Sequence, residues 1–215
     1  MGGIGYLYRL RIPRMLRASR RYIFFAVFLF LCGVVMGFYL FKANPAATGK
    51  VIDVLISKFK HLNMEMEGLS LWGRVKLVFW NNLRVALLCV LSGVLLGIIP
   101  MLVVFVNGFF IGAISANAAR RGVDILTFLL VGVAPHGIFE IPAFLLGGVL
   151  GIRLGFNILA YERGSQRGRL LKRVIGDILL AFFTLIIPLL GLAAFVEMTV
   201  TRFLVRWVLG PSPYY

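Results

Sequence analysis

The sequence is poor in charge, and acidic residues are its scarcest charged type. Only 14% of its 215 residues are charged, whereas a soluble domain carries about 25%. Acidic residues number 8 against 23 lysines and arginines, and 60% of the chain is hydrophobic. This composition excludes a large soluble domain, because too little of the chain suits a water-facing surface.

Cysteine and histidine are also scarce, with two of each. Cys32 and Cys89 both lie within apolar runs, so we expect small buried side chains rather than a disulfide or metal ligands. The sequence has no HExxH motif and no Ser/His pair arranged as in an intramembrane protease. It therefore indicates no catalytic residues, no metal site and no cofactor, and we do not expect an enzyme.

What the chain has in abundance is long uncharged runs. Tyr22–Phe41 contains 20 residues without a charge. An α-helix rises ~1.5 Å per residue, so this run can cross a hydrocarbon core of ~30 Å. It is too long for a typical signal peptide and is not closed by an obvious cleavage site, so we interpret it as an uncleaved anchor. Residues 1–21 before it form a basic segment that we place in the cytoplasm.

A second apolar region, Leu83–Ala118, contains only one charged residue, Arg84. It is too long for one crossing, and Pro100 near its middle removes a backbone donor and disfavours helix before it. The sequence therefore predicts two spans, at about 82–99 and 101–119. A further span is predicted at about 175–197.

The stretch 124–161 allows two interpretations. Its first apolar piece, 125–134, is too short to cross, and prolines follow at positions 135 and 142. One interpretation is a re-entrant half-helix followed by a long helix at about 137–160, and the other is a single kinked span. We favour the broken form, since polar groups and two prolines at membrane depth need a protein-lined or watery setting.

The connection 42–80 is predicted to be extracytoplasmic and amphipathic. Within it, apolar residues recur at helical spacing over 51–66, as in a helix that lies at the membrane interface or packs on the bundle. The fold class is accordingly all-α, a polytopic membrane bundle of about five transmembrane helices with this extra helix. Residues 22–199 form a single transmembrane domain, and 200–215 form a C-terminal tail.

The net charge of +15 does not indicate nucleic-acid binding, because the basic residues cluster beside the apolar runs. The positive-inside rule places both the N-terminal segment and the basic connection 161–173 in the cytoplasm of a cell-membrane protein, although Arg120 and Arg121 then fall outside. The lipid bilayer is the first partner. The residues predicted to bind anionic lipid headgroups are Arg17, Arg20, Arg21, Arg167 and Arg169.

Glycines recur at four-residue spacing in four of the predicted spans. In a helix such glycines share one face and allow another backbone to approach closely. We expect close packing within the bundle, and a homo-oligomer, most simply a dimer, could also use such a face. The glycines are Gly33 and Gly37, Gly93 and Gly97, Gly108 and Gly112, and Gly147, Gly151 and Gly155.

Polar groups within the apolar segments are the candidate functional residues. His136 and Glu140 are four residues apart, so they share a helix face. Three roles compete for this pair: a structural hydrogen-bond network, which we rank first, a proton or substrate pathway, and a metal or catalytic site, which lacks a third ligand beside the pair. The other polar candidates at membrane depth are Asn81, Asn82, Arg84, Asn107, Arg153 and Asn157.

Taken together, several short elements resemble the stage II sporulation protein M family over most of residues 20–197. The elements are Phe79-Trp80-Asn81-Asn82, Gly93 with Gly97, Asn107-Gly108 with Gly112, His136-Gly137-x-x-Glu140-Ile141-Pro142-Ala143, and the glycines up to Gly155. The resemblance implies a multi-spanning helical membrane protein. It also implies a membrane component of a complex that remodels the cell wall beside separate wall-degrading enzymes.

Two main hypotheses follow. The first is a non-enzymatic scaffold that recruits envelope-remodelling proteins, with the outside helix 51–66 and the glycine faces as docking surfaces. The second is a transporter or channel for an ion, a small solute or a lipid, built around the broken fourth segment. A membrane metalloenzyme that uses His136 and Glu140 is a third and more remote hypothesis.

Overall fold

The computed structural model describes residues 4–45, 49, 54, 57, 61–159 and 167–210. Over these residues the ordered elements are all helical and no strand occurs, which confirms the all-α prediction. In this described part of the chain, five helices are long and apolar enough to cross a membrane. They are Leu7–Ala43, Leu71–Val94, Ile98–Arg120, Ile125–Ile158 and Gly168–Val208.

Most of these long helices are built from several consecutive elements. The first consists of the π-helical η1 (Leu7–Arg11) and α2 (Ile12–Ala43), and the short α1 (Ile4–Tyr6) precedes it. The second and third are α4 (Leu71–Leu91) with the 3₁₀ turn η2 (Ser92–Val94), and α5 (Ile98–Arg120). The fourth is α6 (Ile125–Phe128), the π-helical η3 (Leu129–Val133) and α7 (Ala134–Leu159). The fifth is α8 (Arg167–Ala181), η5 (Phe182–Ile186), α9 (Ile187–Val196), η6 (Glu197–Thr201) and α10 (Arg202–Val208), where η5 and η6 are π-helical.

Local sequence explains where two helices begin. The Ser70 hydroxyl accepts a hydrogen bond from the Gly73 amide and caps α4. Asp124 caps α6 in the same way, accepting from the backbone amide of Thr127 at 2.7 Å and from its hydroxyl at 2.9 Å. These bonds lower the pKa of the Asp124 carboxyl below its ordinary value.

The sequence predicted that the second and third spans separate at Pro100. In the structure they separate at residues 95–97. Leu96 and Gly97 have positive φ angles of 58° and 76°, and the left-handed Gly97 precedes the first turn of α5. Pro100 lies inside that first turn, where a backbone N–H has no intrahelical partner to lose. The second helix also starts earlier than predicted, at Leu71 instead of about 82.

The favoured broken form of the fourth segment is wrong, and the single kinked span is what the structure contains. Ile125–Ile158 is one continuous helix that includes the π-helical η3 just before Pro135. Pro142 lies inside α7. Local π-helical turns re-pair backbone groups around a bend, so the prolines do not force the helix to end.

Two predicted boundaries also move outward. The fifth helix extends to Val208, so residues 200–208 of the predicted tail continue the helix. At the other end, residues 7–21 of the predicted basic segment continue the first helix, and Ile12, Met15 and Ser19 within them are buried. Of the predicted amphipathic helix 51–66, only 61–66 and two isolated positions are described, and 61–66 are helical.

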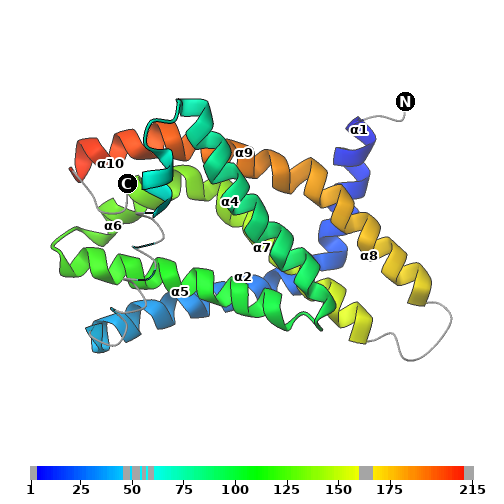
Figure 1. Ribbon diagram of the computed structural model, residues 1–215. Coiled ribbons are helices and arrows are strands. Elements are labelled where there is room, and N and C mark those ends of the chain that lie inside the picture. The colour runs from blue at the N-terminus through cyan, green and yellow to red at the C-terminus, as the bar shows by residue number, and fades with distance from the viewer. Residues whose placement is uncertain are drawn as a thin grey trace.

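The helices α2 and α5 lie side by side and run in the same direction (Figure 1). The glycines of each helix face the backbone of the other: Gly33 faces Phe105, Gly37 faces Phe109, and Gly112 faces Val34. Any side chain at these glycines would overlap main-chain atoms. A similar contact joins Gly93 of η2 to Gly151 of α7. The glycine faces are thus occupied within one chain, so a dimer would have to use other surfaces.

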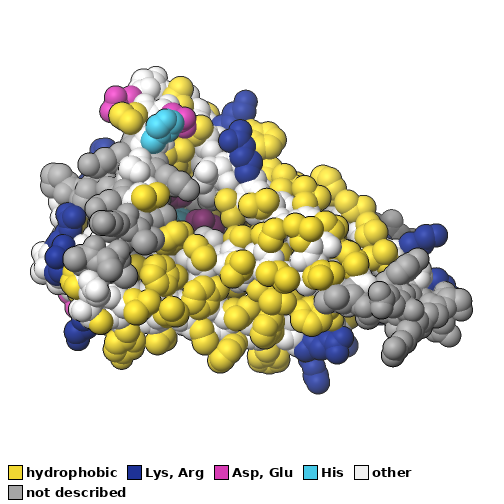
Figure 2. Space-filling model, turned by 60° about the horizontal axis from the view of Figure 1, so that its bottom comes forward, with side chains coloured by type: hydrophobic (Ala, Val, Ile, Leu, Met, Phe, Trp, Pro, Cys, Tyr) yellow, Lys and Arg dark blue, Asp and Glu magenta, His cyan; other side chains and the backbone are white. Residues whose placement is uncertain are grey.

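The central helix of the bundle is α7, which contacts α2, α4, α5, α8 and α9. Its residues Ala143, Leu150 and Ile152 are fully buried. Hydrophobic side chains cover the middle of the face seen in Figure 2, while lysines and arginines lie toward its margins. This pattern fits a bundle whose middle section faces lipid. The helix α7, which carries His136 and Glu140, lies at the centre of that bundle.

Candidate functional site

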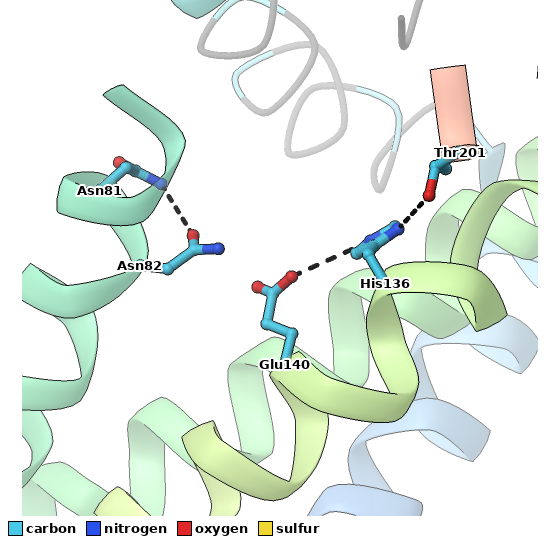
Figure 3. Close-up of polar contacts among 5 residues, drawn as sticks. All are labelled: Asn81, Asn82, His136, Glu140 and Thr201. Carbon is cyan, nitrogen blue, oxygen red and sulfur yellow. Dashed lines mark hydrogen bonds and ion pairs between the residues drawn. The ribbon is translucent and has the colours of Figure 1, made fainter. Parts of the chain in front are cut away.

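The candidate site is centred on His136 and Glu140, one turn apart on α7. His136 Nε2 lies 3.9 Å from a carboxylate oxygen of Glu140, and their side chains are 13% and 32% exposed. The predicted common face is therefore present, and the two groups point toward each other (Figure 3).

The structure adds a third ionisable residue, Glu197, which the sequence analysis did not single out. One ligand atom from each of His136, Glu140 and Glu197 lies within 4.8 Å of the others. Glu197 is the first residue of η6, near the end of the fifth helix. Its signal in the sequence was an acidic residue with apolar segments on both sides, but it coincided with the predicted end of the span.

The other ring nitrogen of His136 has a partner from the same helix as Glu197. His136 Nδ1 lies 3.2 Å from the hydroxyl of Thr201, which is fully buried. Thr201 follows Glu197 by four residues, so both side chains project from one face of the fifth helix toward α7. The imidazole is therefore held on two sides, by Thr201 and by the Glu140 carboxylate (Figure 3).

A basic residue lies beside the cluster. Arg202 follows Thr201, and its charge acts on Glu197. Its guanidinium donates to the side-chain oxygen of Asn63 at 2.8 Å and contacts the sulfur of Met66 at 3.2 Å. These contacts tie the segment 61–66 to the fifth helix next to the acidic groups.

The predicted asparagines differ in their relation to the cluster. The Asn81 amide donates to the Asn82 side-chain oxygen at 3.3 Å, and Asn82 points toward the side of Glu140 that faces away from His136 (Figure 3). Asn107 instead donates to the carbonyl of Val103, one turn earlier on α5. Asn82 thus faces Glu140 from α4 in this view, whereas Asn107 is bonded to its own helix.

A second polar group lies between α7, α8 and α2. Arg153 forms an ion pair with Asp177 at 2.9 Å and donates to the Ser19 hydroxyl at 3.0 Å. The side chains of Arg153 and Asp177 are only 7% and 14% exposed. The sequence analysis named Arg153 but not its partner. This contact joins residues from three helices, which fits a structural role better than a binding role.

Of the predicted headgroup-binding arginines, Arg17, Arg20, Arg21 and Arg169 are exposed. Arg21 donates to the Tyr22 hydroxyl at 3.0 Å and lies over its ring. The side chain of Arg167 lies outside the described residues. Exposure alone does not test lipid binding, which stays a prediction.

Comparison with known proteins gives one family and one weak relative. The family model described as "Stage II sporulation protein M" matches residues 26–202. A protein of Methanocaldococcus jannaschii that bears the name "Uncharacterized protein MJ0793" is 28% identical over 134 residues, which cover 61% of this chain and 73% of the relative. No solved structure matches.

Proposed function

Because the chain belongs to the stage II sporulation protein M family, we propose that it is a non-enzymatic membrane component that recruits partner proteins for remodelling of the cell envelope. The observation that carries this proposal is an exposed arginine, Arg84, on the outer face of α4. It marks a surface where the bundle needs a partner of opposite charge.

Arg84 belongs to an exposed stripe along α4. Asn81, Arg84, Leu88 and Leu91 follow one another at spacings of three and four residues, and all four are exposed. The described part of the chain offers Arg84 no hydrogen bond and no ion pair. The stripe thus combines apolar side chains with one cation that has no partner among the residues the structure describes.

Packing contacts support a position for Arg84 near the middle of the membrane. Ala86, half a turn away, faces Gly147 of α7, and the adjacent Gly148 faces Val104 of α5. The next residue of α5, Phe105, faces Gly33. Since Gly33 lies near the middle of the uncharged run 22–41, Arg84 lies at a similar depth.

An arginine that faces lipid at this depth is costly. Measured insertion costs are about 2.5–3.5 kcal/mol, and calculated ones are higher. A transmembrane helix that places an aspartate or glutamate against Arg84 offsets this cost by an ion pair and buries Leu88 and Leu91 as well. We therefore assign the α4 stripe to a partner helix with an acidic side chain at membrane depth.

A second copy of this chain fits the stripe poorly. Of the acidic residues within the described membrane helices, Glu140 and Glu197 belong to the His136 cluster and Asp177 is paired with Arg153. The remaining acidic residues lie between the five long apolar helices in the sequence and are Asp53, Glu65, Glu67, Asp124 and Glu162. A copy packed on α4 would thus bring no suitable carboxylate to Arg84, whereas another protein can.

The proposed orientation places the N-terminus in the cytoplasm. Five crossings put the start of the first helix at the same end of the bundle as the end of α7 and the start of α8 (Figure 1). Both regions are rich in basic residues, with six arginines among residues 9–21 and five basic residues among 163–173. The positive-inside rule supports a cytoplasmic location for this end in the cell membrane.

Replacement of Arg84 by alanine should release the partner without unfolding the bundle. Breaking an ion pair in a buried interface costs about 2–5 kcal/mol, so recovery of the partner should fall at least about tenfold. The measurement is quantitative co-purification from native membranes after mild crosslinking. Arg121→Ala, which removes an exposed arginine from the turn after α5, is the matched control and should retain the partner.

Unchanged recovery with Arg84→Ala would contradict the proposal, as would recovery of the chain only with itself. The latter result would favour transport, the alternative function. The continuous fourth helix weakens the case for transport, because a broken helix was the sequence feature that suggested a binding site. A flux assay in liposomes with Glu140→Gln would then be the next experiment.

A further inference from the structure

We propose that His136, Glu140 and Glu197 bind a divalent transition-metal ion, with Zn²⁺ as the best match, between α7 and the fifth helix. The three side chains offer one nitrogen and two carboxylate oxygens within 4.8 Å of one another. This site is separate from the α4 stripe and does not depend on the function proposed for it.

The spacing of the groups suits a metal after a small inward movement. Metal–ligand distances of about 2.0–2.1 Å in a tetrahedral site imply ligand–ligand distances of about 3.3 Å. His136 Nε2 and the Glu140 oxygen are 3.9 Å apart. These two atoms would have to approach by less than an ångström, and the Glu197 oxygen, which lies within 4.8 Å of both, by a larger amount.

The orientation of His136 favours metal binding through Nε2. Its Nδ1 faces the buried Thr201 hydroxyl at 3.2 Å. With the proton on Nδ1, the ring donates to Thr201, and the Nε2 lone pair is directed toward Glu140. A histidine ligand commonly donates its second ring N–H to a neighbouring oxygen, which fixes the tautomer and the ring orientation.

The composition of the cluster also suits a cation. Two carboxylates, Glu140 and Glu197, face one histidine, and hard or borderline divalent ions commonly bind carboxylate oxygens. The nearby Arg202 guanidinium bonds to Asn63 and contacts Met66.

The ligand types narrow the choice of metal. Imidazole favours Zn²⁺ over Mg²⁺ or Ca²⁺, and carboxylates are common zinc ligands, whereas no thiolate belongs to this cluster. Three protein ligands leave one coordination position for water. The ion would join the central helix α7 to the fifth helix, beside segment 61–66. Figure 2 shows a recess in the surface in which acidic side chains are visible.

The test is the metal content of the full chain, purified in mild detergent without chelators. Wild-type protein should carry about one zinc ion per chain, and His136→Gln and Glu197→Gln should each lose most of it. The matched control is His61→Gln. His61 and Glu65 are the other histidine–glutamate pair at this spacing, 3.4 Å apart, but they are exposed and no third ligand joins them among the described residues.

A second measurement covers variants that fail to fold. Wild-type protein stripped by a chelator should gain thermal stability when Zn²⁺ is added back, because an ion that binds only the folded state stabilises it. Folded wild type without stoichiometric metal, together with no thermal shift on adding Zn²⁺, would overturn the proposal. Metal that is retained in both cluster variants but lost in His61→Gln would overturn it as well.

Discussion

Gly37→Ala is expected to prevent stable folding of the bundle. A methyl group at Gly37 would overlap the backbone of Phe109, with its Cα only 2.9 Å away. The obstacle is main chain, so a side-chain rotation cannot relieve it and α2 must separate from α5. Overpacking a core costs about 1–3 kcal/mol when side chains can adjust. We expect Gly37→Ala to lower the free energy of unfolding by an amount at or above the top of that range.

The matched control is Gly191→Ala on α9, where a new Cβ meets no atom within 4 Å. Alanine is favoured over glycine in a helix interior by up to about 1 kcal/mol, so this variant should be as stable as the wild type or more stable. The stability of the two variants is measured by thermal unfolding in detergent, and size-exclusion chromatography then shows whether each remains monodisperse. Equal stability of the two variants would mean that α2 and α5 are not packed at Gly37 as described.

Arg153→Met is expected to produce the second large loss of stability. It leaves the Asp177 carboxylate without its cation at a site that is only 14% exposed. Removing one partner of a buried ion pair typically costs about 3–5 kcal/mol, chiefly because the remaining charge is uncompensated. Asp177→Leu should be similarly destabilising, since it leaves the Arg153 guanidinium with only the Ser19 hydroxyl among the contacts described.

The double variant Arg153→Met/Asp177→Leu separates this account from simple loss of packing. Replacing both charges by apolar groups of similar size is often neutral. The double variant should therefore recover most of the stability that either single variant loses. If its thermal midpoint is no higher than those of the single variants, the ion pair is not the reason for the loss.

The number of apolar helices could be predicted from the sequence because it depends on local properties. Uncharged runs and their basic flanks identified the five helices. The boundaries were less accurate, since they depend on backbone details that composition does not reveal. Pro100 suggested a break, but proline is compatible with a first helical turn, and the left-handed Gly97 marks the actual separation. The π-helical η3 likewise lets the fourth helix continue up to and past Pro135.

The site was only half visible in the sequence for a physical reason. His136 and Glu140 share a helix face, and a four-residue spacing reveals that. Glu197 and Thr201 reach the pair from another helix, so their contribution depends on how the fifth helix is rotated and shifted against α7. Asp177 was missed for the same reason, because pairing with Arg153 is a property of packing.

Site-specific photo-crosslinking from Leu88 tests the central claim, that the α4 stripe binds a partner helix. Leu88 is 54% exposed one turn from Arg84, and Leu179 on α8, also 54% exposed, is the control position. In native membranes, Leu88 should crosslink to a protein whose transmembrane segment contains an aspartate or glutamate, and Leu179 should not. The crosslink should vanish in Arg84→Glu. It should return when, in addition, the partner's acidic residue is replaced by arginine. Crosslinks from Leu88 to lipid alone or to a second copy of the chain, or a protein crosslink that Arg84→Glu does not change, would contradict the account.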